Sequence, residues 1–441
     1  GIAAEGRWDE CLDVWRSVVG DGWKNRVGRD LIWRSRGRQT PGLLAELIAD
    51  PATPDSELPR LFRAFDFQQS ETTQPVLLEL AFAASDADDE RRALIQTEAL
   101  NRLQGFNVAD HPEHAEALES ALNSSAGTPQ FVTLVEKFNV SDRFGEVLQL
   151  AQDNASGQLA INAVKALLNR QQTDAIRQAL WGEDASVAEK TLLALGTAAD
   201  GRTVPMLLKL ADDKERPVAL RRAAVSAVAR ARQGAEALQQ QAQDGKIDPA
   251  LKEAIAAALH TAQWPEIKAQ ALKLFPLPPG KDSEPLPSID ELAARTGDVA
   301  RGKILFYTTG TCNKCHVVNT IGQNVGPDLS EIGKKLAKPA MYESILFPSA
   351  AISHNYETWT VLDVEGNVVS GLLVSETPDQ VQIKDEKGLV RTIKTDDIEE
   401  MRQQDISLMP ADIQKLLSAE ELVNVVEYLT TLKQAQPAAS E

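Results

Sequence analysis

The chain has 441 residues, of which 43% are apolar and 25% are charged, and this is the composition of a folded globular protein. A chain of this length predicts two to four domains, and no segment has the ~18 uninterrupted apolar residues of a transmembrane helix. The 64 acidic residues outnumber the 46 basic ones and give a net charge of −18. Such a charge argues against nucleic acid and anionic lipid as partners and suits a basic protein partner.

The first residues and the cysteine count give little evidence of their own. Residues 1–6 lack the basic head and apolar core of a secretory signal, and the chain does not start with Met. We therefore interpret the sequence as a processed or excised piece.

Three cysteines are too few for a disulfide scaffold. Cys312 and Cys315 form a close pair, and Cys11 lies far upstream of them.

Residues 1–275 predict a domain of paired helices. Between residues 156 and 275, four apolar clusters recur at intervals of 28, 33 and 30 residues, and a polar turn and a second apolar helix follow them. The central residues of the clusters are Val164, Leu192, Val225 and Ile255. This pattern resembles HEAT repeats, which implies an α-solenoid that serves as a docking scaffold. The alternative is an irregular helical bundle.

The composition changes at residues 276–290, where five prolines lie between Pro276 and Pro287. Proline fixes φ and lacks an amide donor, so neither a helix nor a central strand is expected here. We expect a semi-rigid linker that separates the helical repeats from a second domain at residues 291–441.

The second domain carries the chemical signature of the chain. After an expected helix at residues 289–306, Cys312, Cys315 and the adjoining His316 have the CxxCH spacing that attaches a c-type haem. Two thiols on one tight turn can add to the two vinyl groups of one haem, and the histidine then binds the iron. A zinc site needs a second cysteine pair, which the sequence lacks, and a thioredoxin-like redox pair has no use for the histidine. The motif predicts one covalently attached haem c.

The sequence around this motif resembles class I cytochromes c. Gly302 and Phe306 match the first helix of that fold, and Tyr428 matches the last helix. Pro327 matches the loop that follows the haem motif. The resemblance implies that the Pro327 carbonyl accepts a hydrogen bond from the free ring nitrogen of His316, which fixes the tautomer of the ligand and raises its basicity.

The resemblance also supplies the second iron ligand. Met409 lies in a Ser-Leu-Met-Pro sequence before the last helix, as in class I cytochromes c, so His316 and Met409 are implied as the axial pair. Three other residues of suitable type remain in the domain. We expect Met341 in the core, Met401 against an inserted sheet and His354 at the surface.

That inserted sheet accounts for the 93 positions from His316 to Met409, which exceed the needs of a small cytochrome. Alternating apolar residues and tight turns predict a small barrel or curled sheet at about residues 355–401. Its four expected strands are residues 356–364, 368–374, 380–384 and 389–394. A sheet this small needs another surface to bury its apolar face, so we expect it to cover one haem edge. The alternative is a solvated sheet that only lengthens a loop.

The complete arrangement resembles the planctomycete and verrucomicrobium-type haem-binding domain, a class I cytochrome c. In that family the domain often follows helical repeats and a β-propeller dehydrogenase. The resemblance implies a mainly α protein: a HEAT-like solenoid followed by an α-helical class I cytochrome c domain with a small all-β insertion. A dehydrogenase domain, if one belongs to the protein, is expected upstream of Gly1 or on a partner chain.

We therefore expect an electron-transfer protein that is not an enzyme by itself. The implied redox partners are a donor dehydrogenase and an acceptor cytochrome or oxidase. Haem c is attached outside the cytoplasm, so we expect the periplasm or an equivalent compartment, with any membrane association made through a partner. Two alternatives stay open. One is a haem enzyme such as a peroxidase, which needs an open iron position, and the other is a mainly structural scaffold.

Overall fold

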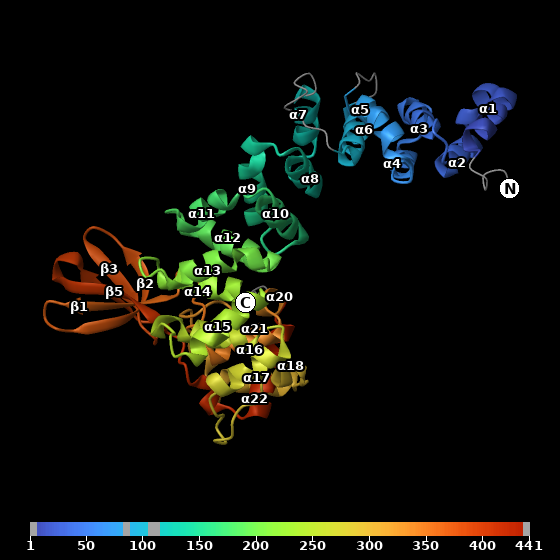
Figure 1. Ribbon diagram of the computed structural model, residues 1–441. Coiled ribbons are helices and arrows are strands. Elements are labelled where there is room, and N and C mark those ends of the chain that lie inside the picture. Colours follow the sequence, from blue (N-terminus) through green and yellow to red (C-terminus); the bar gives the residue numbers. More distant parts are fainter. Residues whose placement is uncertain (1–6, 83–88, 105–114, 435–441) are drawn as a thin grey trace, which may run out of the picture. The chain divides into compact units, whose positions relative to one another are not determined.

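The structure is a computed structural model that describes residues 7–82, 89–104 and 115–434. The chain is mainly helical and contains one small antiparallel sheet (Figure 1). It folds into two compact units, residues 1–176 and residues 177–441, so the division by compactness falls upstream of the proline-rich segment. Within the described ranges, no helix combines the length and the apolar character that crossing a bilayer requires.

The N-terminal unit consists of short helices that pack on their neighbours in sequence. They are α1 (Trp8–Val19), α2 (Arg26–Arg34), α3 (Thr40–Ala49), α4 (Leu58–Phe65), α5 (Ser70–Phe82), α6 (Asp89–Arg102), α7 (Ala115–Ser124), α8 (Pro129–Phe138), α9 (Phe144–Asp153) and α10 (Gln158–Asn169), and α11 (Thr173–Trp181) crosses the boundary. The buried guanidinium of Arg91 donates to the carbonyl oxygens of Ile48, Asp50 and Thr53, which ties α6 to the turn after α3. Buried Leu and Phe side chains fill the helix contacts.

The C-terminal unit begins with further paired helices. They are α12 (Ala185–Ala198), α13 (Val204–Asp212), α14 (Val218–Val228), α15 (Arg232–Gln243), α16 (Lys252–His260) and α17 (Pro265–Leu274). Helix α14 packs against α12, α13 and α16. The backbones of α12 and α14 come close at Gly196, where an added Cβ would lie 3.1 Å from the Cα of Ala227. The small residues of the apolar clusters therefore serve close helix packing.

The proline-rich residues 276–290 are folded onto the core of the C-terminal part of the chain. Leu277 and Leu286 are buried in the same apolar cluster as Leu417. The backbone N–H of Lys281 donates to the Leu417 carbonyl at 3.0 Å. The segment that the sequence predicts as a linker therefore contributes to a packed core. Its two leucines are buried there, whereas its prolines are exposed or half-buried.

Residues 289–307 form two helices where the sequence predicts one. These are α18 (Ile289–Ala294) and α19 (Val299–Tyr307). The break falls at Gly297, whose backbone comes so close to α22 (Ala419–Thr431) that an added Cβ would lie 2.8 Å from the Val423 carbonyl oxygen. The Asp298 side chain then accepts from the N–H of Arg301 and caps α19. The single-helix expectation is wrong because this tertiary contact overrides the helical period.

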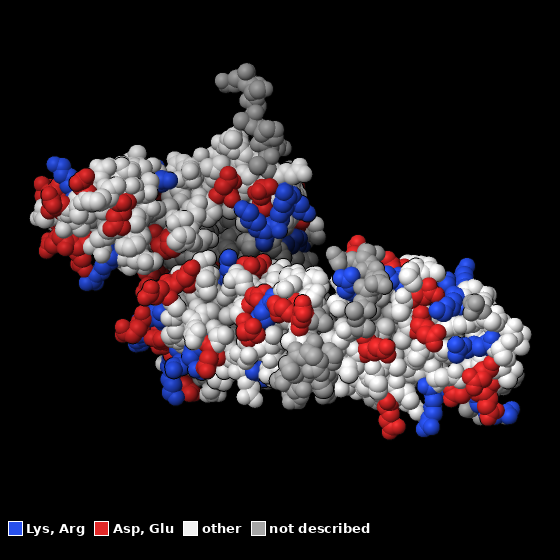
Figure 2. All heavy atoms as spheres, turned by 90° about the horizontal axis from the view of Figure 1, so that it is seen from above, with Lys and Arg blue, Asp and Glu red and all other residues white. Residues whose placement is uncertain are grey.

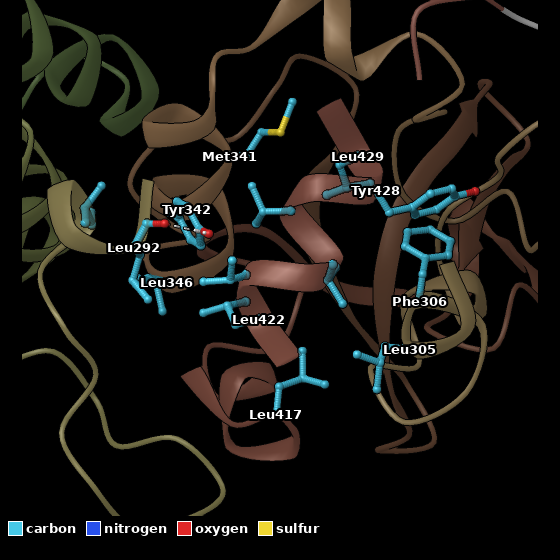
Figure 3. Packing of buried hydrophobic residues seen from close by; sticks show 14 of the residues in the cluster. Leu292, Leu305, Phe306, Met341, Tyr342, Leu346, Leu417, Leu422, Tyr428 and Leu429 are labelled. Atoms are coloured by element: carbon cyan, nitrogen blue, oxygen red, sulfur yellow. Dashed lines mark hydrogen bonds between the residues drawn. The ribbon is translucent and has the colours of Figure 1, made fainter. Parts of the chain in front are cut away.

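Helices α19 and α22 cross in van der Waals contact at the centre of this core (Figure 3). At Gly302 an added Cβ would lie 1.8 Å from the Asn424 carbonyl oxygen, so only glycine fits there. The rings of Phe306 and Tyr428 pack edge to face with centroids 5.7 Å apart. On α21 (Lys338–Leu346), the hydroxyl of the buried Tyr342 donates to the carbonyl oxygen of Leu292 in α18 at 3.3 Å. The short helix α20 (Ile332–Lys335) also packs on α22.

The sheet has five strands, one more than the sequence predicts. They are β1 (Glu357–Asp363), β2 (Val368–Glu376), β3 (Gln380–Lys384), β4 (Val390–Lys394) and β5 (Ile398–Ser407), in the antiparallel order β4-β3-β2-β1-β5. The four predicted strands are present. Strand β5 extends the insertion to Ser407, beyond the predicted end at residue 401. It pairs only with β1 and is mostly exposed, so it lacks the alternating pattern by which a half-buried strand is recognised.

The last residue of α16, His260, contacts the C-terminal core. Its ring stacks on Phe347 with centroids 5.5 Å apart, and its Nε2 lies 2.8 Å from the Phe275 carbonyl oxygen. A carbonyl oxygen only accepts, so Nε2 carries a proton and donates it. Burial lowers the pKa of His260 below its usual value, and the bond to Phe275 opposes this shift in part.

This pKa shift predicts a pH-dependent stability. Below about pH 6.5 the unfolded chain binds a proton at His260 before the folded chain does, so the free energy of unfolding should fall as the pH decreases toward the folded pKa. The slope from this residue is at most about 1.4 kcal/mol per pH unit. Urea unfolding at several pH values should show a shallower dependence for His260→Asn. An Asn variant with an unchanged slope would contradict the assignment.

Candidate functional site

The two cysteines and the histidine of the CxxCH motif lie on one tight turn. Residues 312–314 form a single 3-10 turn, which is preceded by Thr311 in the left-handed region at φ 52°. The N–H groups of Cys315 and His316 both bond to the Cys312 carbonyl oxygen, at 3.1 and 2.9 Å. The turn therefore holds the two thiols and the imidazole within a few residues of one another.

Burial disfavours the thiolate form of both cysteines. It raises the pKa of Cys312 to about 12. Burial also raises the pKa of Cys315, as does the negative charge of Glu386, while Lys314 acts in the opposite direction. The thiolate form that a redox nucleophile uses is therefore disfavoured here. Among the described residues, no three His, Cys, Asp or Glu side chains gather as a metal-binding group.

A loop folds back over the histidine and determines which ring nitrogen carries the proton. The N–H groups of Val325 and Gly326 donate to the Cys315 carbonyl oxygen, at 3.0 and 2.7 Å. His316 Nδ1 lies 2.8 Å from the Pro327 carbonyl oxygen. Because a carbonyl can only accept, Nδ1 is the protonated nitrogen, and Nε2 of the neutral ring keeps a free lone pair. Burial lowers the pKa of His316 and so favours this neutral form, while the bond to Pro327 opposes the shift.

The close approach of this loop depends on Gly326. A Cβ at this position would lie 2.6 Å from Cε1 and 2.9 Å from Nδ1 of the His316 ring. Any side chain would push the ring or the loop away and lengthen the bond to Pro327. The sequence resemblance points to this loop, but the steric reason for glycine is visible only in the folded structure.

A cavity of about 410 Å³ brings four of the five predicted site residues together. Cys315, His316, Pro327 and Met409 line it, and Cys312 packs against the adjoining core. Most other lining groups are aliphatic, including Leu329, Ile332, Leu336, Ile345, Ile352 and Leu429. The volume lies within the range of cofactor sites, and the lining is apolar with few polar groups, as is typical of such sites.

Two methionines line this cavity. Met409 follows β5, and its N–H donates to the Ser407 hydroxyl at 3.1 Å. Met341 on α21 is 2% exposed and belongs to the apolar core, but it also lines the cavity, which the sequence analysis did not foresee (Figure 3). Met401 packs in the small core of the sheet, and the His354 side chain is 82% exposed.

The inserted sheet forms part of the cavity wall. Leu372 of β2 and Tyr356, just before β1, line the cavity. Lys384 at the end of β3 donates through Nζ to the carbonyl oxygen of Asn324 at 3.0 Å. The sheet therefore touches the loop that lies over His316.

Comparison with protein-family models and with curated proteins gives no match.

The packing of Gly326 on the imidazole predicts a steric effect. Gly326→Ala should lower the free energy of unfolding by about 1–3 kcal/mol, because the added Cβ overlaps the His316 ring and the loop has to move. Urea denaturation followed by circular dichroism measures this loss. The matched substitution Gly145→Ala, where a Cβ meets nothing within 4 Å, should cause no loss. Equal midpoints for the two variants would contradict the proposed contact.

Proposed function

We propose that this chain is an electron-transfer protein with one covalently bound haem c. Cys312 and Cys315 attach the haem, and His316 and Met409 ligate its iron. The observation that carries the proposal is the bond from His316 Nδ1 to the Pro327 carbonyl. This bond leaves Nε2 of His316 unprotonated, and Met409 lines the same cavity as this histidine. Held there, the haem supplies reversible one-electron exchange between Fe(III) and Fe(II).

The residues present fit this group. The two cysteines lie three positions apart on one tight turn, so each could hold the haem by adding its S–H across one vinyl group, with a new S–C bond and the proton passing to carbon. Gly326 leaves the imidazole room to keep its bond to Pro327. Aliphatic side chains make up most of the cavity lining, which suits the apolar face of a haem.

The fold supports the same proposal. We infer that residues 291–441 are a class I cytochrome c domain, since α19 and α22 cross through Gly302 and pack Phe306 on Tyr428, as the resemblance implies. The paired helices before residue 275 are taken as a HEAT-like solenoid, from their repeated spacing and their packing on neighbours in sequence. Because the inserted sheet lines the cavity, it would cover one side of a haem held there.

The implied partners are a donor dehydrogenase and an acceptor cytochrome or oxidase, in the periplasm or an equivalent compartment. Haem c attachment supports this location. On the face drawn in Figure 2, acidic and basic side chains are interspersed, and no large area of one sign is seen. Charge therefore does not select a docking face in this view.

Removal of the thiols tests haem attachment. After denaturation of protein made in a host that attaches haem c, the chain should keep one covalent haem by mass and by its pyridine haemochrome spectrum. Cys312→Ala with Cys315→Ala should lose it, because both thioether bonds are removed. Cys11→Ala, a matched change at the remaining cysteine, should keep it. A wild-type chain without covalent haem under these conditions would refute the proposed function.

The two methionines test the iron ligands. Met409→Ala should lower the reduction potential by on the order of 100 mV, because the soft thioether favours Fe(II). Met341→Ala should change it much less and should mainly destabilise the core, where the side chain is buried. A redox titration measures both effects. If Met341→Ala gave the larger fall, the ligand would be Met341, and a wild-type potential well below about −100 mV would instead indicate two histidine ligands.

A further inference from the structure

We infer that the helical repeats position the second iron ligand. In this inference, which rests on the proposed function, Arg222 of α14 and Glu253 of α16 are positioning residues for the segment that carries Met409. The repeats then have a role in the haem site itself, in addition to any role in docking.

The first connection runs from α14 to strand β5. Arg222 is 6% exposed, and its Nε donates to the carbonyl oxygen of Ala250 at 2.9 Å. A terminal nitrogen of the same guanidinium donates to the backbone carbonyl oxygen of Asp405. Asp405 lies four residues before Met409, near the end of β5. One buried cation therefore joins the repeats to the backbone that leads into the ligand.

The second connection runs from α16 to Met409 through two serines. The Glu253 carboxylate accepts from the N–H of Ser349 at 3.0 Å. The Ser349 hydroxyl accepts from the N–H of Ser407 at 3.0 Å, and the Ser407 hydroxyl accepts from the N–H of Met409 at 3.1 Å. These three hydrogen bonds form one network, in which each backbone N–H has one defined acceptor. The bonded residues therefore restrain one another.

Packing gives the residues before Met409 little support, since Asp405 and Ile406 are exposed. Residues 351–353 line the cavity of His316, and they also line a second cavity of about 460 Å³ that Arg222 and Asp405 line as well. A segment with space on two sides can shift at little cost in van der Waals contact. Strand β5 is an edge strand that pairs only with β1. Hydrogen bonds to a charged guanidinium and a charged carboxylate are stronger than neutral ones, and they supply the missing restraint.

The consequence is a measurable competition at the iron. A well-held methionine resists replacement by an added ligand, whereas a loosened one is displaced more easily, because apparent affinity scales with the population of the open form. Imidazole, titrated into the ferric holoprotein and followed by absorption, is the probe. Circular dichroism and the haemochrome spectrum check folding and attachment in every variant.

Arg222→Gln and Ser349→Ala should each raise the affinity for imidazole about tenfold, since a hydrogen bond to the Met409 segment is lost in each. Arg232→Gln is the matched control and should bind imidazole as the wild type does. The hydrogen bonds described for Arg232 go to Glu236 and Glu266, both within the repeats and away from Met409 in the sequence. If Arg222→Gln fails to fold, Ser349→Ala carries the test, since it removes a single hydroxyl.

The inference would be overturned if folded Ser349→Ala and folded Arg222→Gln both bound imidazole with wild-type affinity while Met409→Ala bound it more tightly. That result would leave the proposed function intact. If Met409→Ala also bound imidazole as the wild type does, Met409 would not be the ligand, and the inference would fall with that assignment. A chain without covalent haem would refute the proposed function itself.

Discussion

The hydrogen bond between His316 Nδ1 and the Pro327 carbonyl oxygen is the interaction on which the candidate site depends. It assigns the ring proton to one nitrogen and leaves the other able to bind a metal. The bond exists because Gly326 has no side chain to keep the loop away from the ring. It also depends on the Cys315 carbonyl, which accepts from two N–H groups of that loop and so holds the loop over the motif.

The helices around the motif keep this loop and turn in place. The crossing of α19 and α22 is close because Gly302 allows it, and the proline-rich segment covers part of the same core through its leucines. Glycine at a crossing is costly in helix propensity, by about 1 kcal/mol relative to alanine. Here that cost is offset by backbone contact between two helices, which brings Phe306 and Tyr428 together.

Helices α14 and α16 and the C-terminal core are linked by specific polar and aromatic contacts. His260 stacks on Phe347, Glu253 accepts from the backbone of Ser349, and Arg222 donates to the backbone of β5. All three contacts lie within one compact unit. Helices α14 and α16 therefore pack with the C-terminal core as parts of one compact unit.

The sequence by itself determined the features that depend on local spacing. The CxxCH turn, the paired helices and four strands with alternating residues could be predicted, because the residues that define each of them are close in the chain. Tertiary structure alone decided the break at Gly297, the burial of the proline-rich segment and the edge strand β5. It also brought Met341 and Met409 into the lining of one cavity. These features depend on contacts between residues far apart in sequence, such as Gly297 with α22, and a local pattern carries no information about such partners.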